Sequence, residues 1–247
     1  MLKVNKRIPG DAIRLIIFDL DGTLIDSRLD LTSSVNAMLV HFGRPALPLD
    51  LIGTYVGDGA PMLVRRALGD PEDEDFLQTA LEFFLGYYRE HKLDHTVVYP
   101  GIFDALQALR KAAKASDERH MAVLSNKPVN PSRAIVEALG LGPFFKQVYG
   151  GNSFPTKKPD PLGALTLARE NDVKPVEAMV VGDSDIDILT ARNAGMWSCG
   201  VTYGFSPHSL EQAPPDVMVN SPRELALVFD PNPSETDEYT ELPGITA

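Results

Sequence analysis

LIIFDLDGTLID, residues 15–26, is the stretch from which the fold of this 247-residue chain can be worked out. Its apolar run ends at Phe18, and two aspartates follow at once, Asp19 and Asp21. A short apolar run bounded by polar turns is typical of a parallel strand that is buried on both faces. Two neighbouring carboxylates at its end lose water and repel each other. The stretch therefore predicts a buried strand followed by a site that offsets this cost.

Similar apolar runs recur along the chain, and segments with helical spacing of apolar residues separate them. The predicted strands cover residues 13–18, 120–126, 178–184, 197–204 and 216–220, with a weaker one at 144–151. The predicted helices cover residues 102–115, 131–140, 160–170 and 185–195. Strands that alternate with helices form right-handed crossovers and a parallel sheet. The expected fold is α/β, a Rossmann-like parallel sheet with helices on both faces.

Residues 27–96 break this alternation, because they show helical periodicity and no convincing strand. The predicted helices here cover residues 29–43, 59–69 and 74–93. We therefore expect an all-helical domain inserted after the first strand. The expected domains are a catalytic core of residues 1–26 and 97–229, the helical insertion at 27–96 and a tail at 230–247. The tail holds five acids and no bases, is rich in Pro, Ser and Thr, and is expected to be disordered.

Four predicted strands carry polar side chains at their carboxyl ends. They are Asp19 and Asp21, then Ser125 and Asn126, then Lys158, and last Asp183 and Asp187. In open parallel sheets, ligands bind outside the carboxyl ends of the strands. The sequence therefore predicts that all of these side chains meet at one rim of the sheet.

The residue types at this rim suit the transfer of a phosphoryl group. Clustered carboxylates favour a hard cation such as Mg²⁺, and Lys158 adds a second positive charge. Ser125 or Asn126 can donate hydrogen bonds to anionic oxygens, and phosphoryl transfer depends mainly on positioning and charge stabilisation. Asp19 can attack phosphorus, while Asp21 can protonate the leaving oxygen and then activate water. Gly22 lets the backbone turn sharply after the two aspartates.

Each of these groups alone also has an ordinary structural explanation. The first two aspartates could cap a turn, although D-x-D-G-T has a chance frequency on the order of 10⁻⁵ per position. Asp183 could be a loop residue, and Asp187 a first-turn helix carboxylate. Lys158 could be a solvated lysine, and residues 125–127 could form a helix N-terminal turn. Their common position at strand ends favours the catalytic interpretation.

The motifs DLDGT, LSNK, KKPDP and VGDSDID resemble, in this order, the four motifs of haloacid dehalogenase (HAD) superfamily phosphatases. The resemblance covers nearly the whole chain apart from its first residues and the tail. It implies that Asp19 is the nucleophile and Asp21 the acid/base. It also implies that Mg²⁺ binds the Asp19 carboxylate, the main-chain carbonyl of Asp21 and Asp183. True dehalogenases lack the second aspartate of the first motif, so Asp21 argues against that activity.

The same resemblance implies roles for the remaining rim residues. Ser125, Asn126 and Lys158 would hold the phosphoryl group, and Asp187 would support the metal from a second layer. Lys158 fits the family spacing K-P-x-P better than Lys157 does.

Within the superfamily, VGDGAPMLVRRAL, NKP, KKPDP, GDSDIDILTARNAG and GVTYGF are most similar to bacterial phosphoglycolate phosphatases. The resemblance implies hydrolysis of 2-phosphoglycolate to glycolate and phosphate through an aspartyl phosphate, with the helical insertion as a mobile cap. Asp185 and Ile186 stand where relatives vary, and the acidic tail is extra.

The cap offers candidates for contacts with the leaving group. Gly57 and Gly59 allow close backbone approach, and the helix that follows them favours an anion at its N-terminus. Arg65, like its neighbour Arg66, could reach a carboxylate. These glycines could instead only start a helix, and both arginines could be solvated. The aromatic run at 83–88 is expected to form cap core rather than a substrate cage.

Other enzyme and binding functions stay open on the sequence. A broad-specificity sugar-phosphate or nucleotide phosphatase and a β-phosphoglucomutase-like mutase would share this core, whereas a non-enzymatic binding protein would not need the full set of site residues. The net charge of −11 argues against nucleic-acid binding. The sequence has no apolar stretch of 18 or more residues, so we expect no membrane span. The lone Cys199 excludes an internal disulfide. We therefore expect a cytoplasmic protein that acts on a small phosphorylated metabolite.

Overall fold

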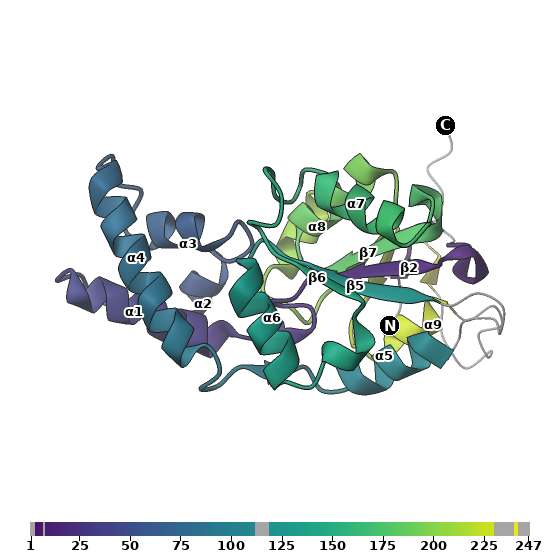
Figure 1. Ribbon diagram of the computed structural model, residues 1–247, viewed down its shortest axis with the longest axis horizontal. Coiled ribbons are helices and arrows are strands. Elements are labelled where there is room, and N and C mark those ends of the chain that lie inside the picture. Colours follow the sequence, from purple (N-terminus) through teal and green to yellow (C-terminus); the bar gives the residue numbers. More distant parts are fainter. Residues whose placement is uncertain (1–2, 7, 112–118, 230–239, 242–247) are drawn as a thin grey trace.

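The computed structural model describes residues 3–6, 8–111, 119–229 and 240–241. Within them, a mixed sheet has the strand order β10-β1-β9-β8-β7-β2-β5-β6 (Figure 1). In chain order its strands are β1 (Lys3–Val4), β2 (Leu15–Phe18), β5 (His120–Leu124), β6 (Gln147–Tyr149), β7 (Ala178–Gly182), β8 (Trp197–Val201), β9 (Val217–Val219) and β10 (Thr240–Glu241). From β6 to β9 all neighbours are parallel, whereas β1 runs antiparallel to β9. The sheet is thus mostly, and not wholly, parallel.

β2 lies in the middle of the parallel part, between β5 and β7. Phe18, its last residue, is paired with Val123 on one side and Val181 on the other. All four residues of β2 are fully buried. The prediction of a strand buried on both faces is therefore confirmed for this stretch, and its end lies at the centre of the sheet's rim.

Helices cover both faces of the sheet because side chains alternate along each strand. Ile16 and Phe18 pack with α5 (Ile102–Lys111), α6 (Val129–Ala138) and α9 (Glu224–Leu227). Leu15 and Ile17 pack with α7 (Leu162–Glu170) and α8 (Asp185–Ala194) on the other face. Figure 1 shows these two helical layers above and below the sheet. Short 3-10 turns cover Gly10–Ala12, Gly142–Phe144, Pro175–Glu177 and Pro207–Glu211.

A separate group of four helices, called the helical unit below, lies beside the sheet at the left of Figure 1. It consists of α1 (Arg28–His41), α2 (Leu49–Gly53), α3 (Ala60–Ala67) and α4 (Glu74–His91). These helices pack around their own hydrophobic cluster, with Val35, Met38 and Phe84 among its most buried members. The sequence did not predict α2, because a helix of five residues is too short to show a period.

The chain enters and leaves the helical unit through a two-stranded antiparallel sheet of β3 (Ile25–Asp26) and β4 (Val97–Val98). Asp30, in the first turn of α1, links that helix to the residues just before β4, and its side chain is only 1% exposed. Its carboxylate accepts hydrogen bonds from the main-chain N–H of His95 at 2.9 Å, and from the N–H and hydroxyl of Thr96 at 2.8 and 2.7 Å. Burial would raise the pKa of Asp30, but these hydrogen bonds outweigh it and hold the pKa below its ordinary value.

Two expectations concern features at the margins of the structure. The predicted disorder of the tail falls mainly on residues 230–239 and 242–247, which lie outside the described residues; residues 240–241 form β10 beside β1. Among the described residues, no helix is both long and apolar enough to cross a lipid bilayer.

Candidate active site

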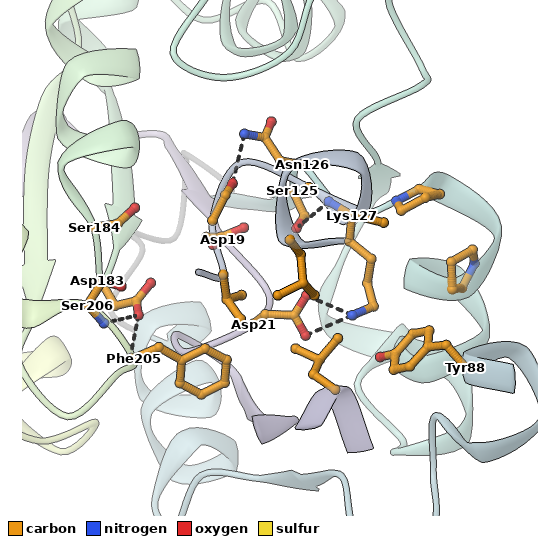
Figure 2. Close-up of a pocket in the computed structure, with 18 of the residues that line it drawn as sticks. Asp19, Asp21, Tyr88, Ser125, Asn126, Lys127, Asp183, Ser184, Phe205 and Ser206 are labelled. Carbon is orange, nitrogen blue, oxygen red and sulfur yellow. Dashed lines mark hydrogen bonds and ion pairs between the residues drawn. The ribbon is translucent and has the colours of Figure 1, made fainter. Parts of the chain in front are cut away.

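A pocket lies between the rim of the sheet and the helical unit, with about 690 Å³ of space that includes its opening to solvent (Figure 2). The rim contributes polar side chains, namely Asp19, Asp21, Ser125, Asn126, Lys127, Asp183 and Ser184. The helical unit contributes a largely apolar wall, namely Leu31, Val56, Gly57, Gly59, Ala60, Leu63, Phe84, Leu85 and Tyr88. The predicted meeting of separate strand ends at one rim is therefore present in the structure.

Asp19 stands where β2 ends, because its main-chain N–H still bonds to the carbonyl of Val181 at 2.9 Å. The ammonium of Lys158 lies 2.8 Å from Asp19 Oδ1 and 2.6 Å from Asp187 Oδ1. Lys158 is buried, although it comes from a loop well separated from both aspartates in sequence. This lysine therefore links the end of β2 to the start of α8.

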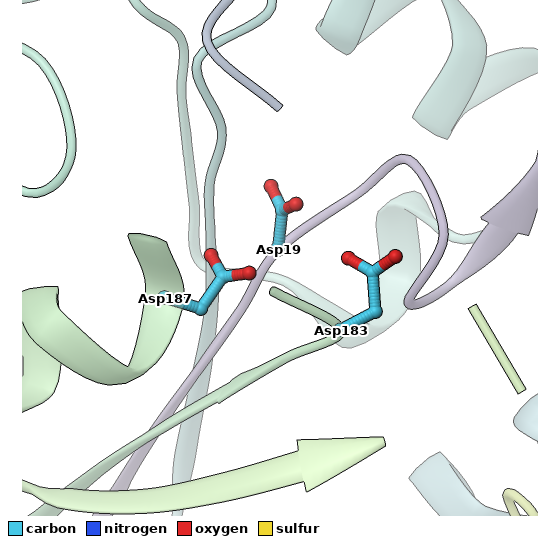
Figure 3. Close-up of side chains that lie close together, drawn as sticks. All are labelled: Asp19, Asp183 and Asp187. Carbon is cyan, nitrogen blue, oxygen red and sulfur yellow. The ribbon is translucent and has the colours of Figure 1, made fainter. Parts of the chain in front are cut away.

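Three buried carboxylates gather at this point, as Figure 3 shows. One oxygen from each of Asp19, Asp183 and Asp187 lies within 4.8 Å of the others. Burial, and then the charges of Asp187 and Asp19, raise the pKa of Asp183 to about 8. Burial likewise raises the pKa of Asp19, in spite of the opposing charge of Lys158. One ammonium does not balance three acids, so the donor set fits an added hard cation with oxygen ligands.

The hydrogen bonds within this group separate ligand candidates from supporting residues. Asp187 Oδ2 accepts a hydrogen bond from the hydroxyl of Ser184 at 2.7 Å, and Asp187 Oδ1 accepts one from the ammonium of Lys158. Asp183 Oδ2 accepts from the main-chain N–H of Phe205 at 2.6 Å. Among the described residues, Asp19 Oδ1 has no well-aligned hydrogen bond although the Lys158 ammonium lies near it, and the hydrogen bonds to Asp183 both end on Oδ2. The carboxylates of Asp19 and Asp183 are therefore the best candidates to hold a cation, with Asp187 held in place behind them.

Asp21 faces a different part of the pocket. Its carboxylate accepts from the ammonium of Lys127 at 2.8 and 3.0 Å and from the hydroxyl of Ser27 at 2.5 Å. Its side chain is therefore not a member of the three-carboxylate cluster, and any part in metal binding would fall to its main-chain carbonyl. Two aspartates one residue apart are thus held in two distinct electrostatic settings.

Ser125 and Asn126 follow β5, and the two residues differ in their freedom to bind a ligand. Ser125 continues the pairing with β6 through its N–H to the carbonyl of Tyr149 at 3.1 Å. The side-chain nitrogen of Asn126 donates to the carbonyls of Gly57 and Lys158, both at 3.0 Å. Both amide hydrogens of Asn126 are thereby engaged, so its side chain ties the pocket walls together rather than pointing free donors at a ligand.

The loop before α3 reaches the pocket, as predicted for Gly57 and Gly59, but Arg65 does not. Its guanidinium pairs instead with Glu74 at 2.6 Å and Asp70 at 3.2 Å. The reason is helical geometry, because Leu63 lines the pocket and two further residues turn an α-helix by about 200°. Arg65 therefore does not line this pocket in the structure, and Arg66 likewise pairs with Asp58 at 2.5 Å.

Lys127 and Tyr88 are among the pocket residues that were not identified from the sequence. Lys127 follows Asn126 directly, so its place in the same turn was the available signal. Tyr88 belongs to the aromatic run at 83–88, which was expected to be core, and it is indeed 4% exposed. It nevertheless lines the pocket, with its ring 4.7 Å from the Lys127 ammonium.

Comparison with known proteins gives concordant matches. Residues 16–201 match the family described as haloacid dehalogenase-like hydrolase. The phosphoglycolate phosphatase of Pseudomonas putida is 39% identical over 224 residues, which cover 88% of this chain and 80% of that protein. The phosphoglycolate phosphatase of Chromobacterium violaceum is 39% identical over 217 residues, covering 86% and 95%.

Solved structures agree with these sequence matches. The crystal structure of a predicted phosphoglycolate phosphatase from Haemophilus somnus has a TM-score of 0.81 and 30% identity, and covers 89% of this chain and 99% of that chain. A second one, from Lactobacillus delbrueckii, has a TM-score of 0.80 at 30% identity, with the same coverage of both chains.

Proposed function

The chain belongs to the haloacid dehalogenase-like hydrolases and is a phosphoric monoester hydrolase, and from this premise we propose that it hydrolyses 2-phosphoglycolate to glycolate and phosphate. The named activity of the relatives supports this substrate. The geometry supports the reaction type. The single observation that carries the proposal is that Asp19, Asp21 and Asp183 line one pocket while the ammonium of Lys158 lies 2.8 Å from Asp19 behind it.

Magnesium is the cation we assign to the carboxylate cluster. Asp19 and Asp183 would hold it, with Asp187 supporting them through its contacts to Lys158 and Ser184. When bound, the ion would neutralise charge on the phosphoryl oxygens and lessen the repulsion among the carboxylates.

In the first step, a carboxylate oxygen of Asp19 attacks phosphorus, and the bond from phosphorus to the ester oxygen breaks. Asp21, in its protonated form, gives its proton to the leaving oxygen. Lys158 lies 2.8 Å from the nucleophile, where its charge can stabilise the phosphoryl group in transfer. Ser125 is placed at the next strand end, where its hydroxyl can donate to a phosphoryl oxygen. The products are glycolate and an aspartyl phosphate on Asp19.

In the second step, water attacks the phosphorus of the aspartyl phosphate. Asp21, now a carboxylate, accepts a proton from that water, and the bond from phosphorus to Asp19 breaks. Inorganic phosphate leaves, and both aspartates return to their starting states. The separate settings of Asp19 and Asp21 suit these different roles, because Asp19 lies beside Lys158 and the other carboxylates of the cluster whereas Asp21 is paired with Lys127.

The helical unit acts in this proposal as a cap, residues 27–96, on a core of residues 1–26 and 97–229. Its apolar wall would exclude bulk water from the pocket when closed. The loop contacts from Asn126 and Lys157 to the main chain of Gly57 and Asp58 would define the closed arrangement.

The test is a panel of phosphate monoesters, assayed for release of inorganic phosphate with Mg²⁺ and again with EDTA. We expect 2-phosphoglycolate to be the best substrate and EDTA to abolish its hydrolysis. Asp19→Asn should fold and lose all but a trace of activity, and rapid acid quench of the wild type should give a protein mass increased by one phosphoryl group. Equal rates on sugar phosphates or nucleotides would favour a broad phosphatase. Phosphate release that requires a bisphosphate activator would favour a mutase.

A further inference from the structure

We propose that Lys127 and Tyr88 bind the carboxylate of the leaving group and so select small phosphate monoesters whose leaving group is anionic. This inference rests on the proposed phosphatase function and assigns its specificity to two residues that meet at the pocket from different parts of the fold. Lys127 comes from the turn after β5, and Tyr88 comes from α4 of the helical unit.

Lys127 is the one cationic side chain among the described residues that line the pocket. Its side chain is 6% exposed, so its charge acts with little screening by water. An ammonium has three hydrogens, and here two bond with the two carboxylate oxygens of Asp21. The third hydrogen has the Tyr88 side chain beside it, so an oxygen of a ligand bound there can compete for it. The carboxylate of the leaving group, placed beside Asp21, would therefore bind the same Lys127 ammonium.

Tyr88 supplies a hydroxyl that lacks a well-aligned hydrogen-bond partner among the described residues, although it is buried. Buried hydroxyls nearly always have a partner, so an orphaned one that faces a pocket indicates a ligand oxygen. Figure 2 shows this hydroxyl directed towards the Lys127 ammonium, which also lies 4.7 Å from the ring centre. One carboxylate could accept from both groups.

The remaining wall of the pocket argues against other leaving groups. Leu31, Val56 and Leu63 offer no donors to sugar hydroxyls. Both arginines of α3 are paired with acids of their own unit, so they add no second anion site. A compact leaving group with one negative charge matches the largely apolar wall of the helical unit, which carries Tyr88 and lies against Lys127.

The distances along the substrate are also compatible. Asp21 must reach the ester oxygen to protonate it, and Lys127 lies 2.8 Å from Asp21. In 2-phosphoglycolate the carboxylate carbon is only two bonds from that ester oxygen. The carboxylate of the substrate would therefore lie next to the ammonium of Lys127.

The experiment compares 2-phosphoglycolate with 2-hydroxyethyl phosphate, whose leaving group is of similar size but neutral. Lys127→Met should lower the kcat/KM ratio of the charged over the neutral substrate by about 10- to 100-fold, the usual effect of losing a charge-assisted hydrogen bond. Tyr88→Phe keeps the ring and removes only the hydroxyl, and should lower the same ratio by about tenfold, mainly through KM. Lys146→Met, which removes an exposed lysine far from the rim, should leave the ratio unchanged.

The outcomes separate the two proposals. If the wild type hydrolyses both substrates but each variant loses activity equally on both, Lys127 only positions Asp21 and the inference is overturned. If the wild type hydrolyses neither with Mg²⁺, the proposed function itself fails. Should Lys127→Met not fold, Tyr88→Phe decides alone, because an unchanged ratio in that variant contradicts the inference. Calorimetric binding of 2-phosphoglycolate to Asp19→Asn, with and without Lys127→Met, should show the same loss without turnover.

Discussion

Gly22 packs so closely against Asp183 that a Cβ at position 22 would lie 2.3 Å from Asp183 Oδ2. Gly22 also has a φ of +84°, which side chains rarely tolerate. The loop after β2 therefore presses on the loop after β7, and this contact sets the distance between Asp19 and Asp183. A residue with no chemistry of its own thus shapes the proposed metal site.

Gly22→Ala is expected to reduce activity by about 100-fold or more, because displacing a ligand by about 1 Å has effects of this size. The matched control is Gly43→Ala, since Gly43 also has a positive φ, +68°, but has nothing within 4 Å of a Cβ. Both variants should lose about 1–2 kcal/mol of stability from backbone strain. Steady-state assays and urea unfolding measure the two effects. Full activity in Gly22→Ala would contradict the proposed geometry.

Magnesium is expected to raise the melting temperature of the wild type, because it binds the folded state alone. At a concentration of 100 times its Kd, the stabilisation should be about 2.7 kcal/mol. Asp183→Asn should abolish this shift and lower activity by at least about 100-fold. Asp185→Asn changes a neighbouring aspartate outside the carboxylate cluster and should keep both. Thermal unfolding with and without EDTA measures this, and an intact shift in Asp183→Asn would remove Asp183 from the metal site.

Arg65→Ala is expected to leave kcat/KM for 2-phosphoglycolate within about twofold of the wild type. The reason is that its guanidinium is engaged by Glu74 and Asp70 on the far side of α3, and exposed ion pairs contribute little to stability. Arg65→Lys serves as a charge-preserving comparison. A large increase in KM for Arg65→Ala alone would mean that the helical unit rearranges on binding to bring Arg65 inward.

Acid is expected to weaken the attachment of the helical unit through Asp30. Because the folded state holds the pKa of Asp30 below its ordinary value of 3.8, folding favours the carboxylate. Its contribution is therefore complete above that ordinary value and is lost as the pH falls through the lower, folded-state pKa. Asp30→Asn should cost about 1–3 kcal/mol at neutral pH by leaving buried N–H donors poorly paired.

The measurement for Asp30 is urea unfolding of wild type and Asp30→Asn between neutral pH and pH values below 3.8. The difference in stability between them should shrink as the pH is lowered. Glu90→Gln, at an exposed acid of α4, should show no such difference at any pH. A constant difference between wild type and Asp30→Asn across this range would show that the carboxylate charge is not what holds His95 and Thr96.

Much of the core could be predicted because burial leaves a local record in the sequence. The apolar run before Asp19 identified β2, and the runs before Ser125 and Asp183 identified β5 and β7. The strands are a little shorter than predicted, since polar residues at their ends leave the ladder. β1 was missed, because two residues carry no period, and it made the sheet mixed rather than wholly parallel.

The sequence by itself determined which segments form buried strands and therefore which polar residues stand at the rim, since a parallel strand shows its burial in consecutive apolar residues. Only the tertiary structure decided where long side chains point. Arg65 turned away and Tyr88 turned inward because each helix rotates to bury its own apolar face against its neighbours. Lys127 pairs with Asp21 because two loops that are far apart in the chain pack together. Such directions depend on contacts between distant residues, and no local pattern encodes them.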